Sequence, residues 1–271
     1  MLGGRQQKFV SVARKGFRFA LRFLVLSLSL AAGAQSARAD DIVQFSAHVL
    51  NFYQWNQDDS ELNKLDVRLY QDFALGEGWH LRLREDVPIV TTDKIGHDNE
   101  DGNWSTNIGD ACLQAVVTTP EIAENTTLEL GLRTVFPTGG LSPFGDGSYQ
   151  LGPQLGISHR FPDVADGLVI APTARYLFSV HKAYDDADTY KQWQLYPRAE
   201  LAFGDKWEIG LWLENPIVYD NVTNRWFVPL DAMVTHRFEG PISLAAGYAT
   251  AIIDRQPEYK HMVYGRFTIR F

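Results

Sequence analysis

The sequence predicts an all-β fold: a single antiparallel transmembrane β-barrel of about twelve strands, with short periplasmic turns and longer extracellular loops. Three observations lead to this prediction. Apolar and polar residues alternate in segments of about ten residues, short and long connections alternate between these segments, and aromatic residues collect at the segment ends. In a membrane barrel, such alternation places apolar side chains against lipid and polar side chains in the lumen.

About twelve segments show the alternation, and no helical period of comparable length competes with it. In the last segment, Val263, Gly265 and Phe267 share one face of a strand, whereas Tyr264 and Arg266 share the other. In chain order, the predicted strands are 42–54, 64–75, 79–91, 107–118, 126–137, 149–161, 167–181, 190–203, 207–219, 225–238, 242–253 and 260–271.

The connections between these segments alternate in length. The short ones carry turn residues and lie at 76–78, 120–125, 162–167, 204–206 and 239–241. Mostly longer, polar connections lie between them, at 55–63, 92–106, 138–148, 182–189, 220–224 and 254–259. This layout, with both ends of the strand array on the short side, is typical of outer-membrane barrels with periplasmic termini.

Aromatic residues occupy both ends of the predicted strands, as in barrels with an aromatic belt at each water interface. Those at the expected periplasmic ends are Trp79, Phe161, Phe203, Trp207, Phe238 and Phe271. Those toward the loop ends are Phe136, Phe178, Trp193 and Trp226. A last strand that ends on Phe271 also resembles the C-terminal signature of bacterial outer-membrane proteins, which implies the barrel-insertion machinery as a partner.

Residues 1–39 predict a cleaved signal peptide. This stretch holds seven Lys and Arg and no acid, then an apolar run at 23–32 and the sequence Ala37-Arg38-Ala39. The apolar run is too short for a membrane-spanning helix, which needs about 20 residues. We therefore expect a signal peptide at 1–39 and a barrel at 40–271, located in the outer membrane of a Gram-negative bacterium.

Composition narrows the partners. Without the signal peptide, 18 Lys and Arg remain against 33 acids, and this net charge near −15 argues against nucleic acid. The single cysteine, Cys112, can form neither an internal disulfide nor a thiolate metal site, and we expect it to be buried and inert. The expected partners are outer-membrane lipid, lipopolysaccharide and a small-molecule solute.

Motifs of catalysis and cofactor binding are scarce. The sequence has no H-E-x-x-H, C-x-x-C, G-x-S-x-G or G-x-x-x-x-G-K motif, and its acidic loop 93–101 departs from the order of a calcium loop. An outer-membrane lipid hydrolase is the least favoured alternative, because Ser158-His159 and Ser179-Val180-His181 do not match the H-x-S-N-G stretch of that family. We expect no enzyme activity, no cofactor and no metal site.

The predicted inward faces are charged but nearly balanced. Most of these charges are expected to pair with one another in a narrow lumen, and a few to face the path of a solute. The candidate pore-lining residues are Arg68, Arg82, Arg84, Asp110, Glu129, Arg133, Arg175, Arg198, Glu200, Glu214 and Asp231.

The connection at 138–148 is a candidate constriction loop that folds toward the bore. Its glycines permit positive φ and close approach of the backbone, and its prolines stiffen the ends. The residues expected to form it are Pro137, Gly139, Leu141, Phe144, Gly145, Asp146 and Gly147. The alternative is an ordinary flexible surface loop.

Three stretches in the middle of the chain resemble successive motifs of one outer-membrane family. They are Ile108-Gly-Asp-Ala-Cys-Leu-Gln114, Gly131-Leu-Arg-Thr-Val-Phe-Pro-Thr-Gly139 and Phe144-Gly-Asp-Gly-Ser-Tyr-Gln-Leu-Gly-Pro-Gln-Leu-Gly156. They look like motifs of the family named for the meta pathway of phenol degradation. The resemblance implies a barrel that passes aromatic or other small hydrophobic compounds.

The sequence thus predicts an outer-membrane channel or transporter for passive uptake of a small solute, which the resemblance makes aromatic or hydrophobic. One alternative is a structural or surface-interaction barrel whose lumen is plugged. Another is a soluble periplasmic all-β protein, in which the apolar strand faces would be buried against each other.

Overall fold

The computed structural model describes residues 43–187, 189–254 and 259–271, so the predicted signal peptide at 1–39 lies outside the described residues. The sixteen strands of the described part form twelve wall segments, here called staves, four of which are interrupted. The eight uninterrupted staves are β1 (Val43–Trp55), β2 (Glu61–Gly76), β3 (Trp79–Thr92), β6 (Thr126–Phe136), β7 (Ser148–Phe161), β14 (Arg225–Arg237), β15 (Ile242–Asp254) and β16 (His261–Arg270). The four interrupted staves are β4 (Ser105–Ile108) with β5 (Ala111–Thr118), β8 (Leu168–Ile170) with β9 (Thr173–Lys182), β10 (Lys191–Tyr196) with β11 (Ala199–Phe203), and β12 (Trp207–Leu211) with β13 (Ile217–Asp220).

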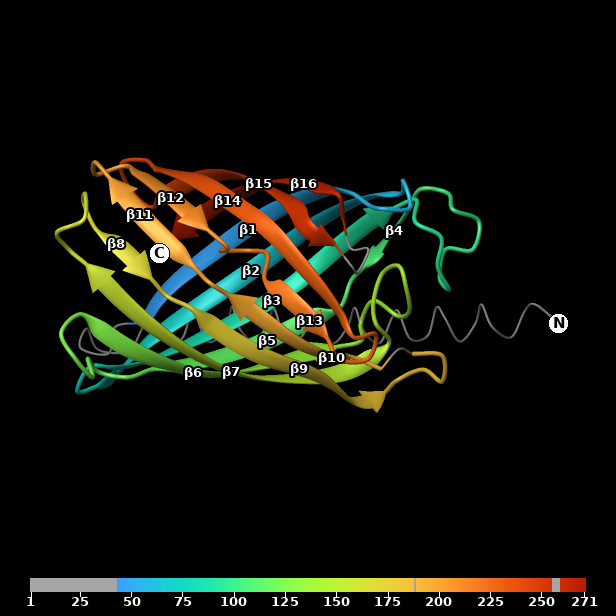
Figure 1. The fold of residues 1–271 in the computed structure, drawn as a ribbon, viewed down its shortest axis with the longest axis horizontal. Helices are drawn as coiled ribbons and strands as arrows, with labels where there is room; N and C mark the ends of the chain where they lie inside the picture. Colours follow the sequence, from blue (N-terminus) through green and yellow to red (C-terminus); the bar gives the residue numbers. More distant parts are fainter. Residues whose placement is uncertain (1–42, 188, 255–258) are drawn as a thin grey trace.

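Every stave pairs antiparallel with the staves before and after it in sequence. The pairing of β1 with β16, which runs from Ser46↔Arg270 to Trp55↔His261, closes the sheet into a barrel (Figure 1). The predicted fold, an antiparallel barrel of about twelve strands, is therefore confirmed. Closure leaves no free sheet edge, so each stave has a hydrogen-bonded neighbour on both sides. Within the described residues, no helix is long and apolar enough to cross a membrane.

Short and long connections alternate around the barrel, as predicted. The turns that join β2 to β3, β5 to β6, β7 to β8, β11 to β12 and β14 to β15 all lie at one end, on the left in Figure 1. We call this the turn end, and the opposite end the loop end. The first residue of β1 pairs with Phe73 near the β2–β3 turn, so the described chain enters the barrel at the turn end. It also finishes there, since Phe271 donates its N–H to Phe45.

The interrupted staves correct the expectation of continuous strands over 107–118, 167–181, 190–203 and 207–219. Three of the breaks contain a proline, Pro172, Pro197 or Pro216, which lacks the N–H that a ladder needs. On the next stave, β14 has a register shift at Val228/Pro229. These four consecutive staves pair with one another on both sides of the three breaks and of the β14 register shift. On the turn side, Ile170, Ala199, Leu211 and Ala232 form one line of pairs. The four prolines therefore form a row across the wall, here called the proline row.

The outer surface of the barrel is apolar. Large exposed side chains include Leu130 and Leu155 on paired strands, and the aromatic residues Trp79, Trp193 and Trp226 near strand ends. Buried side chains, in contrast, include the polar Asp66, Arg68, Asp86, Gln154 and Arg175, which point inward. This distribution is the reverse of a soluble sandwich, and the apolar strand faces are not buried against each other. The soluble alternative is therefore not supported.

Part of the barrel interior is apolar, which the sequence did not predict. A cluster of buried side chains lies on the inner side of β1 and β13–β16; it comprises Leu50, Phe52, Val218, Phe227, Met233, Ala249, Tyr259, Met262 and Tyr264. The cluster fills one side of the barrel and leaves the remaining interior to polar side chains.

Candidate functional site

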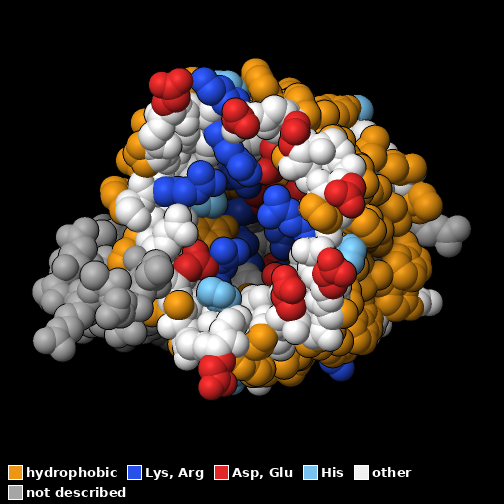
Figure 2. Space-filling view, turned by 90° about the vertical axis from the view of Figure 1, so that its left-hand side faces the viewer, with side chains coloured by type: hydrophobic (Ala, Val, Ile, Leu, Met, Phe, Trp, Pro, Cys, Tyr) orange, Lys and Arg blue, Asp and Glu red, His pale blue; other side chains and the backbone are white. Residues whose placement is uncertain are grey.

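The barrel encloses a cavity of about 920 Å³. It extends from Gln44, His80 and Arg270 near the turn end to Lys64 and Gln150 in the loop half. Figure 2 views the molecule from the turn end, where the surface is hollowed and Lys and Arg side chains gather within the hollow. Nine Lys and Arg but only six Asp and Glu line the cavity, so its wall is positively charged although the whole chain is acidic.

Nine of the eleven candidate pore-lining residues do line this cavity: Arg68, Arg82, Arg84, Glu129, Arg133, Arg175, Arg198, Glu200 and Glu214. They come from β2, β3, β6, β9 and β11, from the break between β10 and β11, which holds Arg198, and from the segment between β12 and β13, which holds Glu214. Alternation along each strand turns the strand residues among them inward. The other two candidates, Asp110 and Asp231, do not line the cavity; both bind backbone N–H groups, as described below.

A carboxylate on β3 holds three arginines together. Asp86, which is 3% exposed, accepts two hydrogen bonds from Arg84 at 2.6 and 2.7 Å. Its oxygens also lie 3.5 Å from Arg133 and 4.0 Å from Arg68. Cys112 donates its Sγ–H to Asp86 at 2.8 Å, so the cysteine is buried, as expected, and hydrogen-bonded. One negative charge is thus shared among three guanidinium groups.

The segment Trp212–Pro216, between β12 and β13, enters the lumen. Its residues 213–216 all line the cavity, which a strand with alternating faces would not permit. Trp212 has a positive φ of 50°, and the backbone N–H groups of Glu214 and Asn215 both donate to Asp231 at 3.0 Å. Asp231 is fully buried, which explains why it anchors this segment instead of facing the cavity. We call residues 212–216 the inward segment.

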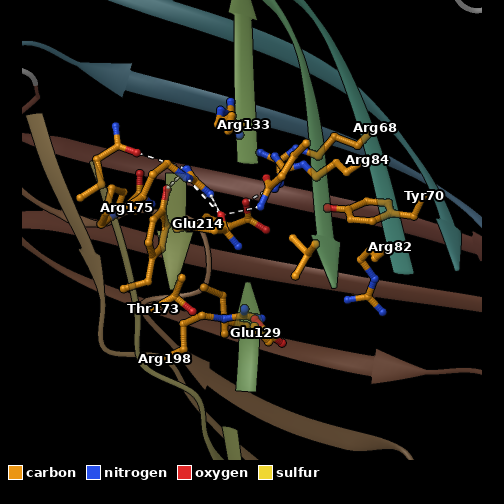
Figure 3. A pocket seen from close by; sticks show the side chains of 18 of the residues that line it. Arg68, Tyr70, Arg82, Arg84, Glu129, Arg133, Thr173, Arg175, Arg198 and Glu214 are labelled. Atoms are coloured by element: carbon orange, nitrogen blue, oxygen red, sulfur yellow. Dashed lines mark hydrogen bonds and ion pairs between the residues drawn. The ribbon is translucent and has the colours of Figure 1, made fainter. Parts of the chain in front are cut away.

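The inward segment delivers a carboxylate to the arginines. Glu214 accepts a hydrogen bond from Arg68 at 2.6 Å and another from Arg266 at 3.4 Å. Arg68 also donates to Asp66 at 2.8 Å, so its charge is fully paired. Arg68, Arg84 and Arg175 are all directed into the cavity around Glu214 (Figure 3).

Arg175 on β9 differs from these arginines because its partners are neutral. Its guanidinium donates to Gln154 at 2.8 and 3.2 Å, to Gln194 at 3.2 Å and to the Tyr196 hydroxyl at 3.4 Å. No described Asp or Glu forms an ion pair with it within 4.0 Å. Arg175 is also buried, with only 5% of the residue exposed. Arg175 is thus a buried cation that neutral acceptors fix in position.

The candidate constriction loop is folded against neighbouring loops. Asp98 accepts the N–H of Leu141 at 2.7 Å, and Asp110 accepts the N–H groups of Gly139 and Asp146 at 2.9 and 2.8 Å. Asp110 lies in the break between β4 and β5, and these bonds turn it toward the loop rather than the cavity.

Most of this loop is buried, including Pro137, Gly139, Leu141, Phe144 and Gly147. A Cβ at Gly145 would lie 2.4 Å from Asp110 Oδ1, so only glycine permits this approach. Asp146 is the loop residue that reaches the cavity wall. The loop is therefore packed against its neighbours, and its role as a constriction stays a prediction.

Sequence reasoning missed the neutral members of the wall. Gln114, Gln154 and Gln194 line the cavity between the arginines, at inward positions of their strands. The sequence signal that could have found them is their inward position in the alternation of each strand. In the structure, Gln114 pairs with Arg84 and Arg133, and Arg175 pairs with Gln154 and Gln194. Among the described residues, no group of three or more His, Cys, Asp or Glu is placed to hold a metal ion.

Comparisons with known proteins identify the fold. No protein-family model matches the chain, and no curated protein matches its sequence. Among solved structures, an outer membrane channel from Pseudomonas putida F1 is similar with a TM-score of 0.64 and 12% identity, over 87% of this chain and 97% of that one. The NanC porin has a TM-score of 0.52 and 11% identity, over 82% and 98% of the two chains. The β domain of a Bordetella autotransporter has a TM-score of 0.51 and 12% identity, over 85% and 100%. The chain has the fold of outer-membrane β-barrels.

Proposed function

We propose that this protein is an outer-membrane channel for the passive passage of a small solute. The observation that carries the proposal is the polar cavity of about 920 Å³ inside a closed barrel whose outer surface is apolar. A cavity of this size exceeds a single water site by far and falls in the range that holds small molecules. The proposal needs no cofactor, metal or catalytic group.

The location follows from the same surface. Exposed Leu, Ile and aromatic side chains over the wall would contact the outer-membrane lipid, and lipopolysaccharide would surround the loop end. The proposed route includes cleavage of residues 1–39 and recognition of Phe271, which is 71% exposed, by the insertion machinery.

The resemblance to the phenol meta-pathway family adds an aromatic or hydrophobic solute to the proposal. The cavity lining restricts this solute class further, because a wall of arginine, glutamine and carboxylate side chains is better suited to a solute with a polar or charged group. An aromatic solute with a polar or charged group fits both the family resemblance and the polar lining of the cavity.

A plugged barrel with a structural or surface-interaction role is the second candidate. It is favoured by the inward segment, the folded loop 137–147 and the apolar cluster, all of which narrow the lumen. The two candidates differ in whether ions can cross.

Single-channel recording in planar bilayers tests the proposal. The refolded protein would be compared with a variant that lacks residues 139–147, with folding of both verified by heat-modifiable migration on a gel. We expect discrete conductance steps that are larger in the shortened variant, because Asp146 of this loop lines the cavity and loss of the loop would widen the path. Absence of conductance steps from both folded proteins would reject the channel in favour of the plugged barrel.

A further inference from the structure

We propose that the solute of this channel is a small organic monocarboxylate, and that Arg133 and Arg175 form the site that selects it. The inference rests on the proposed function and names its solute class.

The wall of the cavity carries a net positive charge. The cavity lining carries nine cationic and six anionic side chains, and the buried Asp86 behind it adds one more negative charge. A positive excess remains, in a lumen that is partly shielded from water. Such a surface attracts anions and repels cations, since charged walls of low dielectric raise the local concentration of the opposite ion.

The arginines of the wall differ in how completely carboxylates match their charge. Arg68 is matched by Asp66 and Glu214, and Arg84 is matched by two short contacts to Asp86. Arg133 has only the 3.5 Å contact to the same, already shared carboxylate. Arg175 has neutral partners alone among the described residues. Lys64 and Arg270 also line the cavity without an ion pair among the described residues, but they lie toward its loop end and its turn end. The unmatched charge in the middle of the cavity is therefore located at Arg133 and Arg175.

The side chains of Arg133 and Arg175 lie near each other in the wall. Arg133 on β6 pairs directly with Gly152 on β7. Gly152 has no side chain, and the aliphatic part of Arg175 occupies that space, with its Cδ 3.0 Å from where a Cβ would lie. The stem of Arg175 thus lies over the residue paired with Arg133, and both guanidiniums face the cavity. Because β7 lies between β6 and β9, the two backbones are two strand spacings apart, about 10 Å. Two arginine side chains that extend into the cavity can span this distance to contact one small anion.

Two arginines in this arrangement favour a carboxylate as the ligand. A guanidinium matches a carboxylate through two parallel N–H···O bonds. The wall already contains such a pair, because Arg84 donates to both oxygens of Asp86. Arg68 and Arg266 each donate to one oxygen of Glu214. The four contacts of Arg175 use at most four of its five N–H groups. A dianion is disfavoured, because Asp86 and Glu214 remain bound to the adjacent arginines.

Selectivity measured in bilayers is the first test. In a KCl gradient, we expect a reversal potential of the sign that indicates anion preference, shifted toward zero in Arg175→Gln and in Arg133→Gln. Arg225→Gln is the matched control, because Arg225 is exposed at the end of β14 and does not line the cavity. A cation-selective channel, or equal shifts in all three variants, would overturn the inference while leaving the channel itself established.

Binding measured without a membrane separates the two proposals. Benzoate and its neutral counterpart benzamide would be titrated into the detergent-solubilised protein by calorimetry. We expect benzoate alone to bind, about tenfold more weakly in Arg175→Gln, with Arg175→Lys between the two because lysine keeps the charge but loses the planar fork. Equal binding of benzoate and benzamide would contradict the site. Inorganic phosphate that binds more tightly than benzoate would contradict the assignment to monocarboxylates.

A protein that binds benzoate in this manner but gives no conductance steps would reject the channel and retain the anion site. The two failures are therefore distinguishable.

Discussion

The phenol ring of Tyr264 lies over Gly247, the residue paired with it on the adjacent strand β15. A Cβ at position 247 would overlap the ring, and the Tyr264 hydroxyl donates to the fully buried Asp231. Asp231 in turn binds the backbone of the inward segment. The absence of a side chain at residue 247 thus permits the contact that positions Glu214 in the lumen.

Replacing Gly247 by alanine is expected to destabilise the barrel. The new methyl group would displace Tyr264 from the Asp231 carboxylate, and overpacking of this kind costs about 1–3 kcal/mol. The measurement is the temperature at which the folded band is lost in a gel-shift series. Gly265→Ala is the control, because its Cβ would meet only the Ala245 carbonyl at 3.7 Å. Equal temperatures for both variants would show that the Tyr264 contact is unimportant.

Removing the charge of Glu214 is expected to increase anion preference. Glu214→Gln would leave Arg68 and Arg266 without this carboxylate, and we expect the anion-to-cation permeability ratio to rise by at least about twofold. The ratio follows from reversal potentials in a salt gradient. Glu239→Gln serves as control, because Glu239 is exposed near the β14–β15 turn and pairs with Lys206. An unchanged ratio would mean that Glu214 does not face the ion path.

Two carboxylates are expected to hold the loop 137–147 in place. Replacing Asp98 and Asp110 by alanine removes the acceptors of three loop N–H groups, each of which costs about 1–3 kcal/mol when buried and unpaired. We expect chymotrypsin to cleave the loop at Leu141 or Phe144 in this double variant and to spare the unaltered protein, as read by mass spectrometry. Asp101→Ala changes an exposed residue of the loop 93–104 and should behave like the unaltered protein. Equally rapid cleavage of all three would rule out this anchoring.

A charge on the outer wall is expected to be costly only where lipid covers it. Leu155 is 56% exposed in the middle of β7, and Leu155→Arg should cost about 2–4 kcal/mol if the position lies near the bilayer midplane. Val164 is 43% exposed in the β7–β8 turn, and Val164→Arg should be nearly neutral. Urea unfolding of both variants from lipid vesicles measures the difference. Similar costs at the two positions would place β7 outside the membrane.

The strand pattern was predictable because one physical rule governs it. Alternation sets which residues face inward, and it placed Arg68, Arg133 and Arg175 on the lumen side before any pairing was known. Turn residues similarly marked the end of the barrel at which the described chain enters and finishes. These signals are local, so they can be read from the chain without knowledge of distant neighbours.

The features that shape the lumen depend on contacts between distant staves. The inward segment requires Asp231 from β14, and Tyr264 from β16 requires the gap left by Gly247. Alternation also assigns Leu50 and Phe52 to a lumen expected to be polar, and only the structure shows that they join an interior apolar cluster. The neutral partners of Arg175 were not predicted for the same reason, because glutamine gives no charge pattern to follow.

The proline row has a mechanical consequence for the barrel. Four consecutive staves each lack an amide donor at nearly the same level along the barrel axis. The hydrogen-bond ladder is therefore weakest along one line between the turn half and the loop half of the wall. The turn half and the loop half of this wall can therefore bend relative to each other along the proline row, while the strand pairs on either side stay hydrogen-bonded. Amide hydrogens next to the proline row should exchange with solvent faster than those of the unbroken β1–β2–β3 wall.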